Sequence, residues 1–211
     1  MDGTFLGAIE AITAAINENK DFLTDLDREI GDADHGVNMA RGFNTVVSRL
    51  KDAPPADLAA GLKSVAMTLI STVGGASGPL YGTAFLRAVK PAQEKSAVDP
   101  ELAAQMLRAA IDGVEQRGGA ARGDKTMIDA LEPAYDAFAA AKDKGASLAE
   151  CLDAAVSATE QGVEFTKTIA ARKGRASYLG DRSIGHQDPG ATSVTIILKA
   201  LASYDKSVGQ E

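Results

Sequence analysis

The sequence of 211 residues has no tryptophan, few other aromatic residues and one cysteine. Aromatic residues make up 5% of the chain, and its apolar content is mostly Ala, Leu, Ile and Val. This composition favours closely packed helices over a β-sandwich. Because Cys151 is alone, no intrachain disulfide can form, and a cytoplasmic location is expected. Cys151 lies at helical spacing from other apolar residues without a basic neighbour to activate it, which indicates a buried structural thiol.

Long apolar runs and clusters of basic residues are also missing. No stretch approaches the roughly 18 apolar residues of a transmembrane helix, and no basic segment followed by an apolar run opens the chain. Neither a membrane span nor a secretory signal is therefore expected. The net charge of −7 argues against nucleic acid as the main partner, because binding to its phosphates needs clustered Lys and Arg. The length suits one domain, expected to cover residues 1–211.

Helical periodicity recurs along the whole chain and predicts eight helices. Pro54 and Pro55 cannot continue a helix, Pro100 suits a first turn, and Ser147 with Glu150 has the pattern of a capping box. The run SVTIILKAL has the composition of a buried strand, but it would have no partner strand, so a helix is predicted. The fold class is therefore expected to be all-α, with helices over about 5–30, 38–50, 58–73, 79–89, 100–114, 127–142, 147–171 and 188–201.

The breaks between these helices are glycine-rich and polar, as binding loops on a rigid scaffold are. Four of them read GDADHG, GGASG, RGGAARGDKT and KGRASYLGDRSIGHQDPG. The last leaves about fifteen residues between helices, which exceeds the usual connection length and indicates a functional loop. Its members include Arg175, for which a solvated surface charge is the alternative, and Arg182, to which only packing or a surface charge is assigned. Both histidines of the chain, His35 and His186, lie in these loops, and either a functional or a structural role is open for each.

The first of these loops gathers Asp27, Asp32 and Asp34. On an ideal helix Asp27 and Asp34 share a face, and Asp32 points roughly 140° away. The three carboxylates can converge only where the chain leaves the helix, which Gly31 and Gly36 permit. Converging carboxylates repel one another unless a hard cation binds them. The alternative is an acidic helix end with a solvated turn.

The second loop offers free backbone N–H groups and Ser77 just before a helix, which is a favourable place for a phosphate. It is not a Walker A motif, and a tight turn between helices is the alternative. Together the loops are expected to supply a cation site, at least two phosphate-sized anion sites and a long polar segment able to cover a ligand. A nucleoside diphosphate with Mg²⁺ explains all of them, and two Mg²⁺ ions would balance three aspartates and a diphosphate.

Four segments of the sequence then resemble, in order, the nucleotide-binding L subunit of dihydroxyacetone kinase. They are also similar to the C-terminal domain of the single-chain ATP-dependent kinases. The resemblance runs from about residue 5 to 203 and implies an eight-helix antiparallel barrel, with ADP or ATP bound in the loops at one end. The segments are LDREIGDADHGVNMARGF, GGASGPLYGTAF, GDKTMIDAL and GRASYLGDRSIGHQDPGATS.

The same resemblance implies roles for individual residues. Asp27, Asp32 and Asp34 would be the Mg²⁺ ligands, and Arg175 would act at the phosphates as the catalytic residue. Relatives often have Ser or Thr at the position of Ala76, so backbone contacts are expected to matter more than side chains in that turn. The residues implied to contact the nucleotide are His35, Asn38, Ala76, Ser77, Gly118, Met127, Arg175, Asp188, Pro189 and Gly190.

The function implied is that of a phosphotransferase subunit. A phosphohistidine on an M subunit would regenerate ATP from the bound ADP, and a K subunit would present the covalently held ketose. No ketose site or second catalytic domain is evident in this sequence, so a partner chain is required. The alternatives are a kinase for another small ketose such as a tetrulose, an assembly that uses free ATP, a nucleotide sensor that binds a transcription regulator, and a structural barrel without nucleotide.

Overall fold

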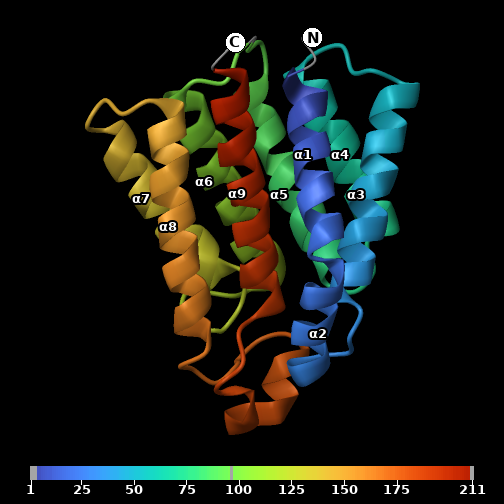
Figure 1. Cartoon of the computed structure of the whole chain (residues 1–211), viewed down its shortest axis with the longest axis vertical. Helices are drawn as coiled ribbons and strands as arrows, with labels where there is room; N and C mark the ends of the chain where they lie inside the picture. The colour runs from blue at the N-terminus through green and yellow to red at the C-terminus, as the bar shows by residue number, and fades with distance from the viewer. Residues whose placement is uncertain (1–3, 96, 210–211) are drawn as a thin grey trace.

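The computed structural model describes residues 4–95 and 97–209, and within them it contains nine α-helices, one 3₁₀ segment and no strand (Figure 1). The predicted all-α class is confirmed. The 3₁₀ segment, η1, is Arg175–Ser183. The α-helices are α1 (Thr4–Glu18), α2 (Lys20–Ile30), α3 (His35–Asp52), α4 (Leu58–Thr72), α5 (Ser77–Ala92), α6 (Pro100–Gly118), α7 (Ile128–Lys142), α8 (Leu148–Thr166) and α9 (Pro189–Val208).

The long helices form a closed ring. From α3 onward each helix packs against the one before it in the chain, and α9 closes the ring against α1 (Figure 1). The inward faces meet in one large apolar core, to which α1, α3, α4, α6 and α7 contribute fully buried side chains. The eight-helix antiparallel barrel is confirmed, with α1 and α2 together as the first of the eight. Examples of these core residues are Ile12, Phe43, Leu69, Ile111 and Phe138.

The first predicted helix is bent at Asn19, where α1 ends and α2 begins. The backbone ladder continues through the bend, since the Asn19 N–H donates to Ala15 O (3.1 Å) and the Leu23 N–H donates to Asn19 O (2.9 Å). The Asn19 side chain also donates to Ala15 O (2.9 Å). Beyond the bend, α2 packs against α3, α9 and η1. It therefore carries the acidic loop across one end of the ring.

Two glycines bring neighbouring helices into close contact. A Cβ at Gly162 of α8 would lie 2.2 Å from the backbone oxygen of Asp129 in α7. A Cβ at Gly82 of α5 would lie 2.9 Å from the backbone oxygen of Ala66 in α4. Any side chain at these positions would separate the helix pairs, which is why a tightly closed ring needs glycine there.

The seventh predicted helix is shorter than the periodicity indicates, because α8 ends at Thr166 and does not reach Ala171. The backbone oxygens at its C-terminus have other donors. The Lys125 ammonium donates to Thr166 O, and the Gly185 N–H donates to Lys167 O (2.8 Å). These bonds to distant segments replace the next turn of helix, and the chain leaves α8 toward the end of the ring.

The four glycine-rich loops all lie at one end of the ring, opposite the two chain termini (Figure 1). Because successive helices run in opposite directions, alternate connections fall at the same end. The connections 31–34, 73–76, 119–127 and 167–188 share the end near α2 and η1. Among the described residues no helix combines the length and the apolar character needed to cross a membrane.

Candidate functional site

Three helix N-termini meet at this end of the ring, and the His35 ring links them. His35 is the first residue of α3, and its Nδ1 lies 3.1 Å from Oγ of Ser77, the first residue of α5. Its Nε2 lies 2.9 Å from Oγ of Ser193 in α9, one turn after that helix begins at Pro189. Burial lowers the pKa of His35 although Asp27 and Asp34 lie close to it. Unpaired N–H groups and the helix dipoles make such a junction favourable for anions.

The predicted carboxylate cluster forms beside the N-terminus of α3. Asp27, Asp32 and Asp34 each offer an oxygen, and these three atoms lie within 4.8 Å of one another. Asp27 is buried, and its Oδ2 accepts the N–H groups of Asp34 (2.8 Å) and His35 (3.1 Å). The Asp34 side chain makes no capping bond of its own. Oxygen donors of this kind suit Mg²⁺, so the residues present fit that ion.

The acidic loop bends in a way that the sequence did not indicate. Ala33, and neither of the glycines, adopts a left-handed conformation (φ 61°). Gly36 lies inside α3, where a Cβ would be 1.9 Å from the backbone oxygen of Lys20. A Cβ at Gly31 would be 2.0 Å from Oδ1 of Asp27. Gly36 therefore allows α3 to pack closely against α2, and Gly31 leaves space for the Asp27 carboxylate.

Arg175 connects the long loop to the carboxylate cluster. Its Nε lies 2.9 Å from Oδ2 of Asp32, and the two side chains are 67% and 35% exposed. Ile30 of α2 packs with Ala171 and Ala176 in a small buried cluster that fixes the loop beside α2. The Arg175 guanidinium thus pairs with one of the three clustered carboxylates while most of its side chain stays exposed, and its role at the phosphates stays a prediction.

The turn before α5 is the second of the glycine-rich loops. Gly75 is left-handed (φ 64°), and Ala76 is exposed at the N-cap without a side-chain capping bond. A Cβ at Gly74 would come within 3.0–3.2 Å of the Asn38 side chain. Asn38 is itself buried and accepts a bond from Nη2 of Arg41 (2.6 Å). The Ala76 side chain offers no hydrogen-bonding group in this turn, and the expectation of backbone contacts there stays a prediction.

The remaining predicted residues divide into two groups. Met127, at the start of α7, lies against Gly190, where a Cβ would be 3.5 Å from the Met127 Cβ. Asp188 caps α9 by accepting the Ala191 N–H at Oδ2 (2.7 Å), so residues 188–190 and Met127 form one wall. Gly118 ends α6, and the neighbour its Cβ would meet is Leu80 (3.2 Å). No contact between Gly118 and the other predicted site residues is found in the part of the chain that the structure describes.

Lys125 was not among the predicted site residues, yet it holds the long loop in place. Its side chain is buried (1% exposed), and the ammonium donates to the backbone oxygens of Thr166 and His186. Burial lowers the pKa of Lys125 although Asp188 and Asp129 lie near it. Burial also raises the pKa of Asp188 to about 7, although the Ala191 N–H and Lys125 each act to lower it. Lys125 belongs to the segment GDKT, but the sequence did not single it out, because a lysine in a polar loop is ordinarily exposed to solvent.

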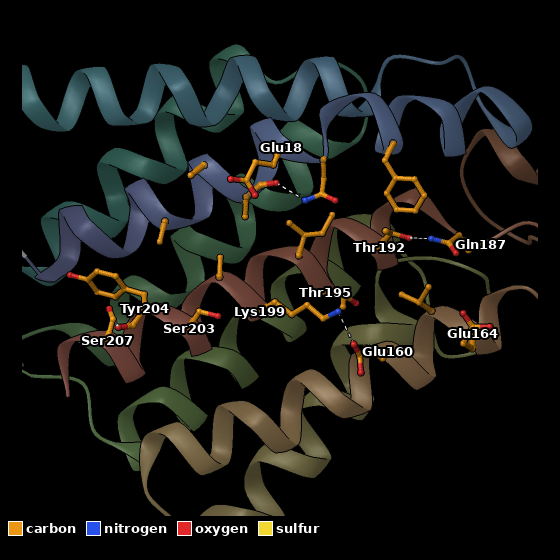
Figure 2. Close-up of a pocket in the computed structure, with 18 residues that line it drawn as sticks. Glu18, Glu160, Glu164, Gln187, Thr192, Thr195, Lys199, Ser203, Tyr204 and Ser207 are labelled. Atoms are coloured by element: carbon orange, nitrogen blue, oxygen red, sulfur yellow. Dashed lines mark hydrogen bonds and ion pairs between the residues drawn. The ribbon is translucent and has the colours of Figure 1, made fainter. Parts of the chain in front are cut away.

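A groove on the outer surface is separate from this site. It has a volume of about 890 Å³ and lies over α9 between α1 and α8 (Figure 2). Ala14, Thr195 and Ala200 are among its lining residues, and the Lys199–Glu160 ion pair (2.7 Å) crosses it. None of the predicted site residues lines the groove. The candidate site residues in the loops at the end of the ring are therefore separate from this groove.

Comparison with known proteins identifies the family of the chain. Residues 29–203 match the DAK2 domain. The chain belongs to the DAK2 domain family. Its DAK2 relatives include the ADP-binding subunit DhaL of the PEP-dependent dihydroxyacetone kinase of Escherichia coli (strain K12), which is 50% identical over 86% of this chain and 87% of the relative. The corresponding subunit of kinase 1 of Listeria innocua is 43% identical over 91% of each chain. The resemblance inferred from the four segments is confirmed.

A solved DAK2-type structure supports the fold. The dihydroxyacetone kinase of C. freundii in complex with AMP-PNP and Mg²⁺ superposes on this chain with a TM-score of 0.75 and 27% sequence identity. The match covers 96% of this chain and 34% of the kinase. This chain thus corresponds to about a third of that larger protein.

Proposed function

We propose that this chain is the nucleotide-binding subunit of a phosphoenolpyruvate-dependent dihydroxyacetone kinase. It would transfer a phosphoryl group from bound ATP to a ketose held on a K-type partner subunit. The observation that carries the proposal is the meeting of three helix N-termini, at His35, Ser77 and Pro189, with a cluster of three carboxylates. An anion site beside a cation site suits a nucleotide with its metal. The names of the relatives, an ADP-binding subunit and a kinase bound to AMP-PNP and Mg²⁺, support the same assignment.

Each part of the site has a role in this proposal. Asp27, Asp32 and Asp34 hold Mg²⁺, two ions in all, which neutralises phosphate charge and stabilises the transferring group. The N–H groups of the turn at 74–77 and of the start of α9 bind phosphate oxygens. Gly118, Met127 and residues 188–190 surround the nucleoside. Arg175, already paired with Asp32, stabilises the charge that develops during transfer.

The partners would supply the remaining chemistry. A K subunit presents the ketose, and a phosphohistidine on an M subunit restores ATP from the bound ADP. Tyr178 and Ile184, 87% and 46% exposed, place apolar surface on the loop that carries Arg175. Exposed apolar side chains beside a reactive centre are typical of a docking face. An alternative is that a transcription regulator binds to the same face. Phosphoryl transfer in a reconstituted mixture would favour the kinase over this alternative.

The experiment combines native mass spectrometry with single-turnover transfer. The purified protein should carry ADP and magnesium, and ATP-loaded protein should phosphorylate the ketose on its partner. Arg175→Ala should slow this transfer on the order of a hundredfold while weakening ADP binding much less, because its interaction forms mainly in the transition state. Arg182→Ala, an exposed arginine of the same loop, is the matched control. Equal rate losses in both variants would show that Arg175 has no special role, and wild-type protein without transfer would refute the kinase.

A further inference from the structure

A chain of buried hydroxyl groups lies behind the His35 ring, away from the carboxylates. Ser193 of α9 is fully buried, and Tyr81 of α5 is 4% exposed. The Ser193 Oγ has three polar neighbours, which are the Tyr81 hydroxyl (2.7 Å), Nε2 of His35 (2.9 Å) and the backbone oxygen of Gly190 (3.0 Å). On the far side of the ring, Nδ1 of His35 meets the Ser77 hydroxyl (3.1 Å). Four side chains from three helices are thus joined in series.

Counting protons limits how this series is arranged. A serine hydroxyl has one proton to donate, and a neutral imidazole has one N–H and one acceptor nitrogen. Burial raises the pKa of Tyr81, so the phenol keeps its proton and can donate it. In a first arrangement Tyr81 and the His35 Nε2–H both donate to Ser193, and Ser193 donates to Gly190 O. The His35 Nδ1 then accepts the Ser77 proton, so Ser77 offers only lone pairs to the site.

A second arrangement uses the same four protons. Ser193 turns its proton from Gly190 O to Nε2 of His35, and Nδ1–H now donates to Ser77. The Ser77 hydroxyl is then free to donate into the site. In this arrangement Tyr81 is the one donor left for the Ser193 oxygen, which lies nearer to the Tyr81 hydroxyl (2.7 Å) than the other available acceptor, Gly190 O (3.4 Å).

We propose that Tyr81 and Ser193 are positioning residues that switch the His35 tautomer, so that Ser77 becomes a hydrogen-bond donor to a bound phosphate. The proposal rests on the proposed function, because a phosphate is the ligand that requires the Ser77 proton. A phosphate oxygen only accepts, so its arrival favours the second arrangement. Without the Tyr81 hydroxyl, the His35 ring keeps its proton on Nε2, because Nε2–H is then the remaining donor to the Ser193 oxygen. Ser77 then turns its lone pairs to the phosphate.

The test follows the ring nitrogens of His35 by ¹⁵N NMR. The chain has two histidines, His35 and His186, so the signals of a ¹⁵N-histidine sample can be assigned with a His186→Gln variant. In the wild-type protein Mg²⁺-ADP should move the His35 proton from Nε2 to Nδ1. In Tyr81→Phe, which keeps the ring volume in the core, the proton should stay on Nε2 and the affinity for Mg²⁺-ADP should fall roughly tenfold. A merely structural role of Tyr81 would not change which nitrogen carries the proton.

Three controls make the outcome decisive. Tyr204→Phe, the same change in a different helix, α9, should behave as the wild type. In Ser77→Ala the ligand should no longer change the tautomer, and adding Tyr81→Phe should cost no further affinity. The Ser77→Ala variant by itself still tests the tautomer switch if Tyr81→Phe does not fold. Two results would overturn the inference but not the proposed function. They are binding of Mg²⁺-ADP to the wild-type protein without a tautomer change, and losses of affinity at Tyr81 and Ser77 that simply add. Wild-type protein that does not bind Mg²⁺-ADP would overturn the proposed function as well.

Discussion

Replacing Lys125 with methionine should lower the free energy of unfolding by about 2–4 kcal/mol. Methionine has a similar length and keeps the aliphatic packing, but it has no donor for the backbone oxygens of Thr166 and His186. A buried acceptor without a partner costs about 1–3 kcal/mol, so two of them give about 2–6 kcal/mol. Removing a buried charge offsets part of this loss, since burial already disfavours the ammonium and lowers the pKa of Lys125.

The substitution should also loosen the long loop. The Thr166 hydroxyl accepts the Asp188 N–H (3.0 Å), so the residue that Lys125 holds is bonded in turn to the start of α9. Once the Thr166 and His186 oxygens lose their common donor, residues 167–188 should exchange their amide protons faster. The affinity for Mg²⁺-ADP should fall with the loss of this order.

The assay is urea denaturation at constant pH, with Lys199→Met as the matched control. Lys199 pairs with Glu160 on the outer surface and is half exposed, so its removal should cost less than about 1 kcal/mol. The two variants should share the wild-type dependence of unfolding on urea and differ in midpoint. If Lys125→Met is no less stable than Lys199→Met, the two buried bonds do not stabilise the protein, and the explanation for the early end of α8 is wrong.

Three further changes test the site and its scaffold. Asp32→Asn should weaken Mg²⁺-ADP binding at least tenfold, about 1.4 kcal/mol, and an unchanged affinity by calorimetry would contradict the metal role. Because burial raises the pKa of Asp188 to about 7, above its value of about 4 in an unfolded chain, nucleotide-free protein should lose stability as the pH rises from about 4 to 7. Asp188→Asn should remove this part of the slope in pH-dependent melting, and a variant that keeps the slope would exclude Asp188 as its origin. Gly36→Ala, whose Cβ would meet the Lys20 oxygen at 1.9 Å, should lower the free energy of unfolding by about 1–3 kcal/mol in a denaturation experiment. Gly118→Ala should cost less, because the neighbour there is a flexible Leu80 methyl group. Equal losses in the two variants would show that α3 moves away from α2 freely.

The helices were predictable because their signal is local. Apolar residues repeat at helical spacing within each helix, and buried side chains such as Ile12, Phe43 and Leu69 follow that spacing. The end of α8 was not predictable in this way. Its last backbone oxygens are bonded to Lys125 and Gly185, and no local pattern indicates a partner 41 residues away in the chain.

The same reason separates the candidate site residues that could be predicted from the sequence from those that could not. Asp27, Asp32 and Asp34 were evident because acidic residues gather in one short segment. Tyr81 and Ser193 look like ordinary inward-facing positions of their helices. The role proposed for them depends on a bond between residues 112 positions apart. Periodicity shows which residues face inward, and only the structure shows which inward-facing polar groups meet.

The antiparallel ring explains why separate loops can form one site. With eight helices in alternating directions, the first, third, fifth and seventh connections fall at one end, and these are the connections that contain the four glycine-rich segments. His35 then extends from α3 to α5 and α9, which are not consecutive in the ring, so its two bonds run across the opening. A substitution in the barrel core should therefore act mainly on stability. A substitution among these four connections should act on ligand binding, because they meet one another at the ends of helices. Where the substituted side chain is buried, as Lys125 is, the change should lower stability as well.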